Sequence, residues 1–149
     1  MMKYNKLGKA LIEPDQKHDI HKFKLVQPSD NESVVIRTRQ IANKAGFNTT
    51  DEVMIATAAS ELATNILRYA SPGDITISIV HSNDKIGVEI LAQDQGLGIR
   101  NLELAMSDNY STSKMSLGMG LPSVQRIMDE LEIESELNHG TRVLVRKWR

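Results

Sequence analysis

An uninterrupted run of helix-favouring residues, 50–70, constrains the fold more than any other stretch of this sequence. It is rich in alanine, leucine and methionine, which favour helix, and it contains neither glycine nor proline. Thr49 and Glu52 have the spacing of a capping box at its start, and Pro72-Gly73 ends it. Apolar residues recur at every third or fourth position, which predicts a helix packed on most of its circumference. These residues are Met54, Ile55, Ala58, Ala59, Leu62, Ile66 and Tyr69.

Two polar residues, Glu61 and Asn65, lie in the middle of this apolar run. They are four positions apart and therefore share one face of the helix. A carboxylate in apolar surroundings is costly unless a charged or protic group meets it, and carboxylate and amide oxygens suit Mg²⁺. The alternative is a solvated polar stripe that also includes Thr57 and Arg68. The spacing of Glu61 and Asn65 alone does not decide between the two interpretations.

The composition is that of an ordinary globular domain. The chain has 149 residues, of which 40% are hydrophobic and 25% charged, enough for one domain with a sizeable core. A net charge of −1 gives no indication of a nucleic-acid partner, and no apolar run approaches the roughly 20 residues of a membrane span. The absence of cysteine excludes disulfides and thiolate metal sites. We therefore expect a cytoplasmic protein that binds neither nucleic acid nor membrane.

The order of the expected elements predicts an α+β fold. Residues 1–20 are polar and are expected to form a flexible tail, so that the domain proper spans residues 21–149. Alternating apolar residues predict strands over residues 21–26, 74–80, 86–92, 133–137 and 141–148. Helices are expected over 29–45, 50–70 and 120–131, with one short helix inside the long connection 94–118. This order predicts a two-layer α/β sandwich, with a mixed, mainly antiparallel sheet and helices on one face.

The segment Asp94-Gln95-Gly96-Leu97-Gly98 follows one of the expected strands directly. Two glycines at a spacing of two remove side chains, so a flat ligand can approach the backbone. A carboxylate beside such a slot can accept a hydrogen bond from an exocyclic amine, as on adenine. The alternative is a tight glycine-rich turn in which Asp94 is only a turn residue.

A second glycine-bearing segment, Gly118-Met119-Gly120, opens the helix expected at 120–131. Pro122 suits the first turn of that helix. Glycines before a helix leave backbone N–H groups available for phosphate, and the helix dipole favours the negative charge. The alternative is an ordinary loop leading into a helix.

Taken together with Gly140-Thr141 before the last strand, these motifs resemble the GHKL ATPase superfamily in order and spacing. The resemblance covers about residues 20–149 and implies the Bergerat ATP-binding fold. Within the superfamily, the chain looks like the RsbT-type serine/threonine switch kinases of bacterial stress partner-switching modules. The anti-sigma kinases of the RsbW and SpoIIAB type are more distant relatives. The matching segments are 61–66, 94–99, 110–113, 118–124, 128–131, 140–141 and 146–148.

The resemblance implies ATP and Mg²⁺ as cofactors and a role for each motif residue. Glu61 would act as base or orienter for the attacking hydroxyl, and Asn65 would supply an oxygen to Mg²⁺. Asp94, helped by Thr141, would bind the adenine amine. Backbone at the remaining nucleotide-binding positions would shape the adenine slot and contact the phosphates: Gly96, Gly98, Gly118, Met119 and Gly120.

The resemblance also implies partners. A kinase of this type phosphorylates a STAS-domain protein and, when released, activates a PP2C-type phosphatase. The alternative is an anti-sigma factor that holds a sigma factor, or a nucleotide-dependent adaptor that acts mainly by binding; a homodimer fits either function. One departure affects the choice, because Lys114-Met115-Ser116 stands where this type carries a glycine pair. Nucleotide binding is therefore a firmer expectation than kinase activity.

Overall fold

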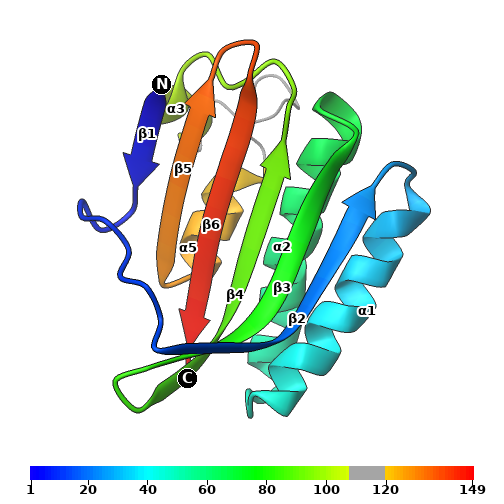
Figure 1. The fold of residues 1–149 in the computed structure, drawn as a ribbon. Helices are drawn as coiled ribbons and strands as arrows, with labels where there is room; N and C mark the ends of the chain where they lie inside the picture. Colours follow the sequence, from blue (N-terminus) through cyan, green and yellow to red (C-terminus); the bar gives the residue numbers. More distant parts are fainter. Residues whose placement is uncertain (108–119) are drawn as a thin grey trace.

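The computed structural model describes residues 1–107 and 120–149, which form one six-stranded sheet with helices on one face (Figure 1). The strand order is β1-β5-β6-β4-β3-β2, and each neighbouring pair in it is antiparallel. The strands are β1 (Met2–Asn5), β2 (Gln16–Leu25), β3 (Gly73–Ser82), β4 (Lys85–Asp94), β5 (Glu130–Glu136) and β6 (Gly140–Trp148). The helices are α1 (Ser29–Lys44), α2 (Thr49–Tyr69), α3 (Leu102–Ala105) and α5 (Leu121–Ile127). The expected α+β sandwich is confirmed.

The core lies between the sheet and the two long helices. On β3 and β4, side chains alternate between the two faces, as the period of two requires. Their helix-facing residues are almost fully buried, and full burial of a side chain of this size contributes roughly 1.5–3 kcal/mol. The buried residues on these strands are Ile75, Ile77, Ile79, Val88, Ile90 and Ala92. Within the described ranges, no helix is both long and apolar enough to cross a membrane.

Helix α2 crosses the middle of the sheet and brings Glu61 and Asn65 to it. Its start differs from the predicted capping box, because Asn48 is the N-cap and its side chain accepts the Asp51 N–H at 2.8 Å. The sheet and α1 bury only part of the helix. Met54 and Tyr69 are each 42% exposed, so the prediction is wrong in placing these two residues on the packed side of the helix.

The last helix is shorter than the sequence pattern predicts. It was expected over residues 120–131, but α5 ends at Ile127, and Met128 has an extended backbone. Strand β5 then begins at Glu130. Met128 and Leu131 are buried, but the extended chain, rather than a helix, carries them into the core. A few apolar residues at mixed spacing fit either period, which explains the error.

Residues 1–20 differ from the expected flexible tail. Residues 2–5 form an edge strand paired with β5, and β2 begins at Gln16 rather than at residue 21. Between them the chain passes from one edge of the sheet to the other (Figure 1). On the way, Ile12 accepts a hydrogen bond from Arg146 Nη1 at 2.7 Å through its carbonyl. An edge strand needs backbone partners more than apolar side chains, so composition alone did not reveal it.

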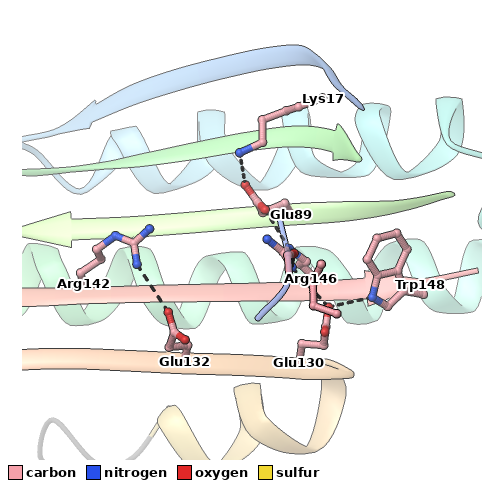
Figure 2. A network of polar contacts seen from close by, with 8 residues as sticks. Lys17, Glu89, Glu130, Glu132, Arg142, Arg146 and Trp148 are labelled. Atoms are coloured by element: carbon pink, nitrogen blue, oxygen red, sulfur yellow. Dashed lines mark hydrogen bonds and ion pairs between the residues drawn. The ribbon is translucent and has the colours of Figure 1, made fainter. Parts of the chain in front are cut away.

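The helix-free face of the sheet carries a network of charges (Figure 2). At its centre, Arg146 Nε donates to Glu89 Oε2 at 2.8 Å, and both side chains are 4% exposed. Lys17 Nζ also donates to Glu89, at 2.6 Å. Glu130 lies 3.7 Å from Arg146 and accepts the Trp148 indole N–H. Buried charges are tolerated when each is paired in this way, so the network ties β2, β4, β5 and β6 together.

Candidate functional site

A cavity of about 220 Å³ lies between α2 and the ends of β4 and β6. Asn65, Asp94 and Thr141 are polar residues of its wall, and Gly98 also lines it. Four of the predicted site residues, from three separate segments of the sequence, therefore meet at one cavity. Much of the remaining wall is apolar and includes Leu62, Ile66, Ala92, Ile99, Leu121 and Val143. A mostly apolar hollow with a few convergent polar groups is the usual form of a small-molecule site.

Asp94 is the last residue of β4 and pairs with Thr141 of β6. Its Oδ1 accepts the Gly96 backbone N–H at 2.9 Å, which fixes the orientation of the carboxylate. Burial raises the pKa of Asp94 above its usual value of 3.8, although the Gly96 and Thr141 backbones act in the opposite direction. A carboxylate held beside an apolar cavity is a strong acceptor for an amine of a bound ligand, because little water competes there.

Close contacts between backbone segments near Asp94 leave room only for glycine at two positions. Gly140 has φ +123°, and a Cβ there would lie 2.0 Å from the Asp94 carbonyl oxygen. Gly98 has φ +80°, and a Cβ there would lie 2.5 Å from the Glu136 carbonyl oxygen. Gly96 does not line the cavity but packs against Ala70 at the end of α2. These glycines let three chain segments approach closely enough to form the wall of the site.

Ser135 supports the site from behind, and the sequence analysis missed it. Its Oγ accepts the Ile99 N–H at 2.7 Å and lies 2.9 Å from the Thr141 hydroxyl, with the residue 1% exposed. Ser135 thereby connects the glycine-bearing turn to the start of β6. A signal was present, because Ser135 follows Leu131 and Ile133 at the period of two that points into the core.

Glu61 and Asn65 lie on successive turns of α2 and reach different surroundings. Asn65 lines the cavity, whereas Glu61 is against Gly120, where an added Cβ would lie 2.5 Å from Glu61 Oε2. Both residues are half-buried. Within residues 1–107 and 120–149, neither side chain makes a hydrogen bond or ion pair, so their oxygens are available to a ligand.

The oxygen ligands around the cavity fit Mg²⁺ only if a bound phosphorylated ligand supplies the rest of its coordination shell. The Asn65 amide oxygen is a hard ligand of the kind that Mg²⁺ accepts. Within the described part of the chain there is no group of three or more histidine, aspartate or glutamate residues that could hold a metal ion. Mg²⁺ commonly takes one or two protein oxygens and completes its shell with phosphates and water. The structure is therefore compatible with a metal that arrives with a phosphorylated ligand.

The segment predicted to contact phosphates is only partly described. Gly118, Met119 and the substitution at Lys114-Met115-Ser116 lie outside the described residues. Gly120 is described; it is buried and is the residue immediately before α5. Its carbonyl accepts the Val124 N–H at 3.0 Å in the first turn of the helix. Gly120 is therefore the one predicted phosphate-binding position that can be located among the described residues, and it lies beside Glu61.

A comparison with protein families matches residues 27–147 to the histidine kinase-like ATPase domain. The match begins after β2 and includes α2, the cavity and the last two strands. It therefore contains every residue that the sequence analysis assigned to the site, and it leaves β1 and β2 outside.

Individual relatives carry two kinds of name. The serine/threonine-protein kinase RsbT of Bacillus subtilis is 46% identical over 110 residues, which is 74% of this chain and 82% of that protein. The anti-sigma F factor of Caldanaerobacter subterraneus subsp. tengcongensis is 36% identical over 138 residues, covering 88% of this chain and 94% of that protein. The anti-sigma F factor of a Thermoanaerobacter species is 38% identical over 127 residues, covering 80% and 87%.

Proposed function

Because the chain belongs to the histidine kinase-like ATPase domain family, we propose that it is a Mg-ATP-dependent protein serine/threonine kinase of a partner-switching module. The observation that carries this proposal is the single cavity lined by Asn65, Asp94 and Thr141, with Glu61 one helical turn away. The 46% identity to a protein named as a serine/threonine kinase favours phosphoryl transfer over ATP binding alone.

The cavity suits the adenine end of ATP. The Asp94 carboxylate accepts a hydrogen bond from the exocyclic amine of adenine, with the Thr141 hydroxyl beside it. A guanine base presents a carbonyl oxygen at that position, which the carboxylate repels. Gly98 and the apolar wall accommodate the flat ring. This arrangement predicts a preference for ATP over GTP, because a mismatched base leaves the buried carboxylate without a donor.

The phosphates and Mg²⁺ are assigned to the other end of the site. Asn65 would hold Mg²⁺ through its side-chain oxygen, and Gly118, Met119 and Gly120 are assigned to the phosphates. Bound Mg²⁺ supplies charge neutralisation at the phosphates. The half-buried position of Asn65 and the lack of a partner for its amide within the described residues support this assignment.

Glu61 is the proposed base for the protein substrate. A serine or threonine hydroxyl attacks the γ-phosphorus; its proton passes to the Glu61 carboxylate as the new O–P bond forms. The bond from the γ-phosphorus to the bridging oxygen breaks, and ADP leaves with that electron pair. Most of the rate enhancement in such a reaction comes from positioning and charge neutralisation, which need no covalent contribution from the protein.

We assign a STAS-domain protein as the substrate and a PP2C-type phosphatase as the partner after release, both in the cytoplasm. A second function is favoured by the anti-sigma F factors that are 36% and 38% identical to this chain. In that function the chain, as a homodimer, holds a sigma factor and acts mainly by binding.

Incubation of the purified chain with Mg-ATP and a STAS-domain protein separates the two functions. We expect phosphate on a serine or threonine of the STAS protein, and its loss in Glu61→Ala. The matched control is Glu103→Ala, because Glu103 is an exposed glutamate on α3, away from the cavity lining. Stable capture of a sigma factor with no phosphate transfer to the STAS protein would contradict the kinase assignment.

The metal role of Asn65 is tested separately by calorimetry with and without Mg²⁺. Asn65→Ala should remove the gain in ATP affinity that Mg²⁺ provides and leave metal-free ATP binding and the melting curve unchanged. An ATP affinity that still rises with Mg²⁺ in Asn65→Ala would show that the metal is held elsewhere.

A further inference from the structure

The N-terminal arm, residues 2–6, is attached to the C-terminal end of α5. Lys6 Nζ donates to the carbonyl oxygens of Gln125 at 2.6 Å and Met128 at 2.7 Å. The Tyr4 hydroxyl donates to the Gln125 side-chain oxygen. Backbone pairing of β1 with β5 and the bond from Lys6 N–H to the Leu131 carbonyl hold the arm in place.

Helix α5 depends on such contacts because it is short. It has seven residues, no side-chain cap at its start and a proline in its first turn. Helices of this length are marginal without tertiary packing, and their last carbonyl groups have no partner within the helix. A cation that bonds these carbonyls also meets the negative end of the helix dipole. Lys6 therefore supplies both the missing donors and the favourable charge.

The other end of α5 belongs to the functional site. Gly120 precedes the helix and lies against Glu61, and Leu121 lines the cavity. Seven residues of helix span only about 10 Å, so a displacement at one end of α5 also moves the other end. The contact at Gly120 is also tight, since an added Cβ there would lie 2.5 Å from Glu61 Oε2. A small shift of α5 would therefore change the surroundings of the Glu61 carboxylate.

The arm also lies beside α3, at the same edge of the sheet (Figure 1). It thus contacts both α3 and α5, the helices that precede and follow residues 108–119 in the chain. The match to the ATPase family begins at residue 27, so the arm lies outside the matched region.

We propose that the N-terminal arm positions α5 against Glu61, and that Lys6 and Tyr4 are positioning residues for phosphoryl transfer. The proposal rests on the kinase function proposed above. The arm touches neither the nucleotide cavity nor Glu61 itself, and it acts through the helix whose first residues do. Its loss therefore slows the chemical step more than it weakens ATP binding.

Lys6→Met tests the proposal because it keeps most of the aliphatic stem and removes the donors and the charge. We expect kcat for phosphoryl transfer to fall about tenfold, with a smaller change in KM for ATP, since a misplacement of about 1 Å caused far from the chemistry can cost about 100-fold. Lys6→Arg should restore most of kcat. The matched control is Lys3→Met in the same arm, at an exposed residue; it should leave kcat unchanged. Equal kcat values in Lys6→Met and Lys3→Met would overturn the proposal.

A second readout does not depend on catalysis. The amides of Val124 and Met128 are bonded within α5, and their hydrogen exchange reports how firmly the helix is held. Exchange at both should accelerate in Lys6→Met and in Tyr4→Phe, while exchange in β3 stays unchanged. Unchanged exchange at Val124 and Met128 in both variants refutes the role of the arm. If the wild-type chain transfers no phosphate, the kinase function fails, and these exchange rates still decide whether the arm holds α5.

Discussion

Replacing Gly140 by alanine should damage both stability and nucleotide binding. Gly140 has φ +123°, and its added Cβ would lie 2.0 Å from the Asp94 carbonyl oxygen and 2.8 Å from the Gln95 Cα. Both neighbours are backbone atoms, which cannot move aside as a flexible side chain can. The strands must therefore separate where Asp94 pairs with Thr141, and both of these residues line the cavity.

The cost of Gly140→Ala has two parts. An alanine in the left-handed region costs about 1–2 kcal/mol, and overpacking against fixed atoms typically costs about 1–3 kcal/mol more. Gly8→Ala is the matched control, because Gly8 has φ +73° but nothing within 4 Å of the added Cβ. Gly8→Ala should lose only the first part. The difference between the two variants reports the clash with Asp94 together with the greater backbone strain of alanine at φ +123° than at φ +73°.

Urea denaturation followed by the fluorescence of Trp148, the single tryptophan, measures both variants, and calorimetry measures their ATP affinity. We expect Gly140→Ala to be destabilised by about 2–5 kcal/mol and to lose measurable ATP binding, whereas Gly8→Ala keeps wild-type affinity. If the two variants lose the same stability and both bind ATP normally, the close approach of β6 to Asp94 is not what requires glycine at 140.

Three further predictions concern residues around and behind the site. Ser135→Ala leaves the buried Ile99 N–H without its acceptor and should cost about 1–3 kcal/mol of unfolding free energy, measured by the same denaturation. Burial raises the pKa of Asp94 above its ordinary value of 3.8. Between the pKa of the unfolded chain and the higher pKa of the folded chain, the folded chain therefore binds more protons than the unfolded chain. The free energy of unfolding should then fall as pH rises through this window in the ligand-free protein, and Asp94→Asn should remove that slope in a pH series of denaturation curves. Glu89→Gln leaves the buried Arg146 guanidinium without its 2.8 Å counter-charge and should cost about 3 kcal/mol. Most of this loss should return in the double variant with Arg146→Met, as thermal melts of both variants would show.

The regular elements of this fold could be predicted because each has one dominant period. The alternation around Ile77 and Ile90 identifies the central hairpin, and the uninterrupted run 50–70 identifies α2 within one residue at each end. The prediction failed where a segment has few apolar residues. Residues 128–131 fit the end of a helix or the start of a strand equally well, and only the packing of β5 against β6 decides between them.

The candidate site was predictable where chemistry and local backbone coincide. Asp94 and Gly98 lie in one short turn, so the motif itself shows their proximity. The contribution of Ser135 depends on its bond to the Ile99 N–H, which comes from a turn 36 residues earlier in the chain and which no local pattern specifies. The role of Lys6 depends on a pairing between β1 and β5, separated by more than a hundred residues. Contacts of this kind follow from sheet topology, which composition does not encode.

The two halves of the site are held by different means, and this difference has a functional consequence. The half that contains Asp94 and Thr141 is formed by the ends of two central strands and by buried bonds to Ser135. Changes there disturb the sheet, so they should lower stability and ATP affinity together. The half that contains Gly120 depends on a seven-residue helix and on Lys6 at its far end. Changes in that half should lower the rate of phosphoryl transfer while the fold and most of the ATP affinity remain. A regulator that acts on this chain without displacing its nucleotide would therefore be expected to act through the second half.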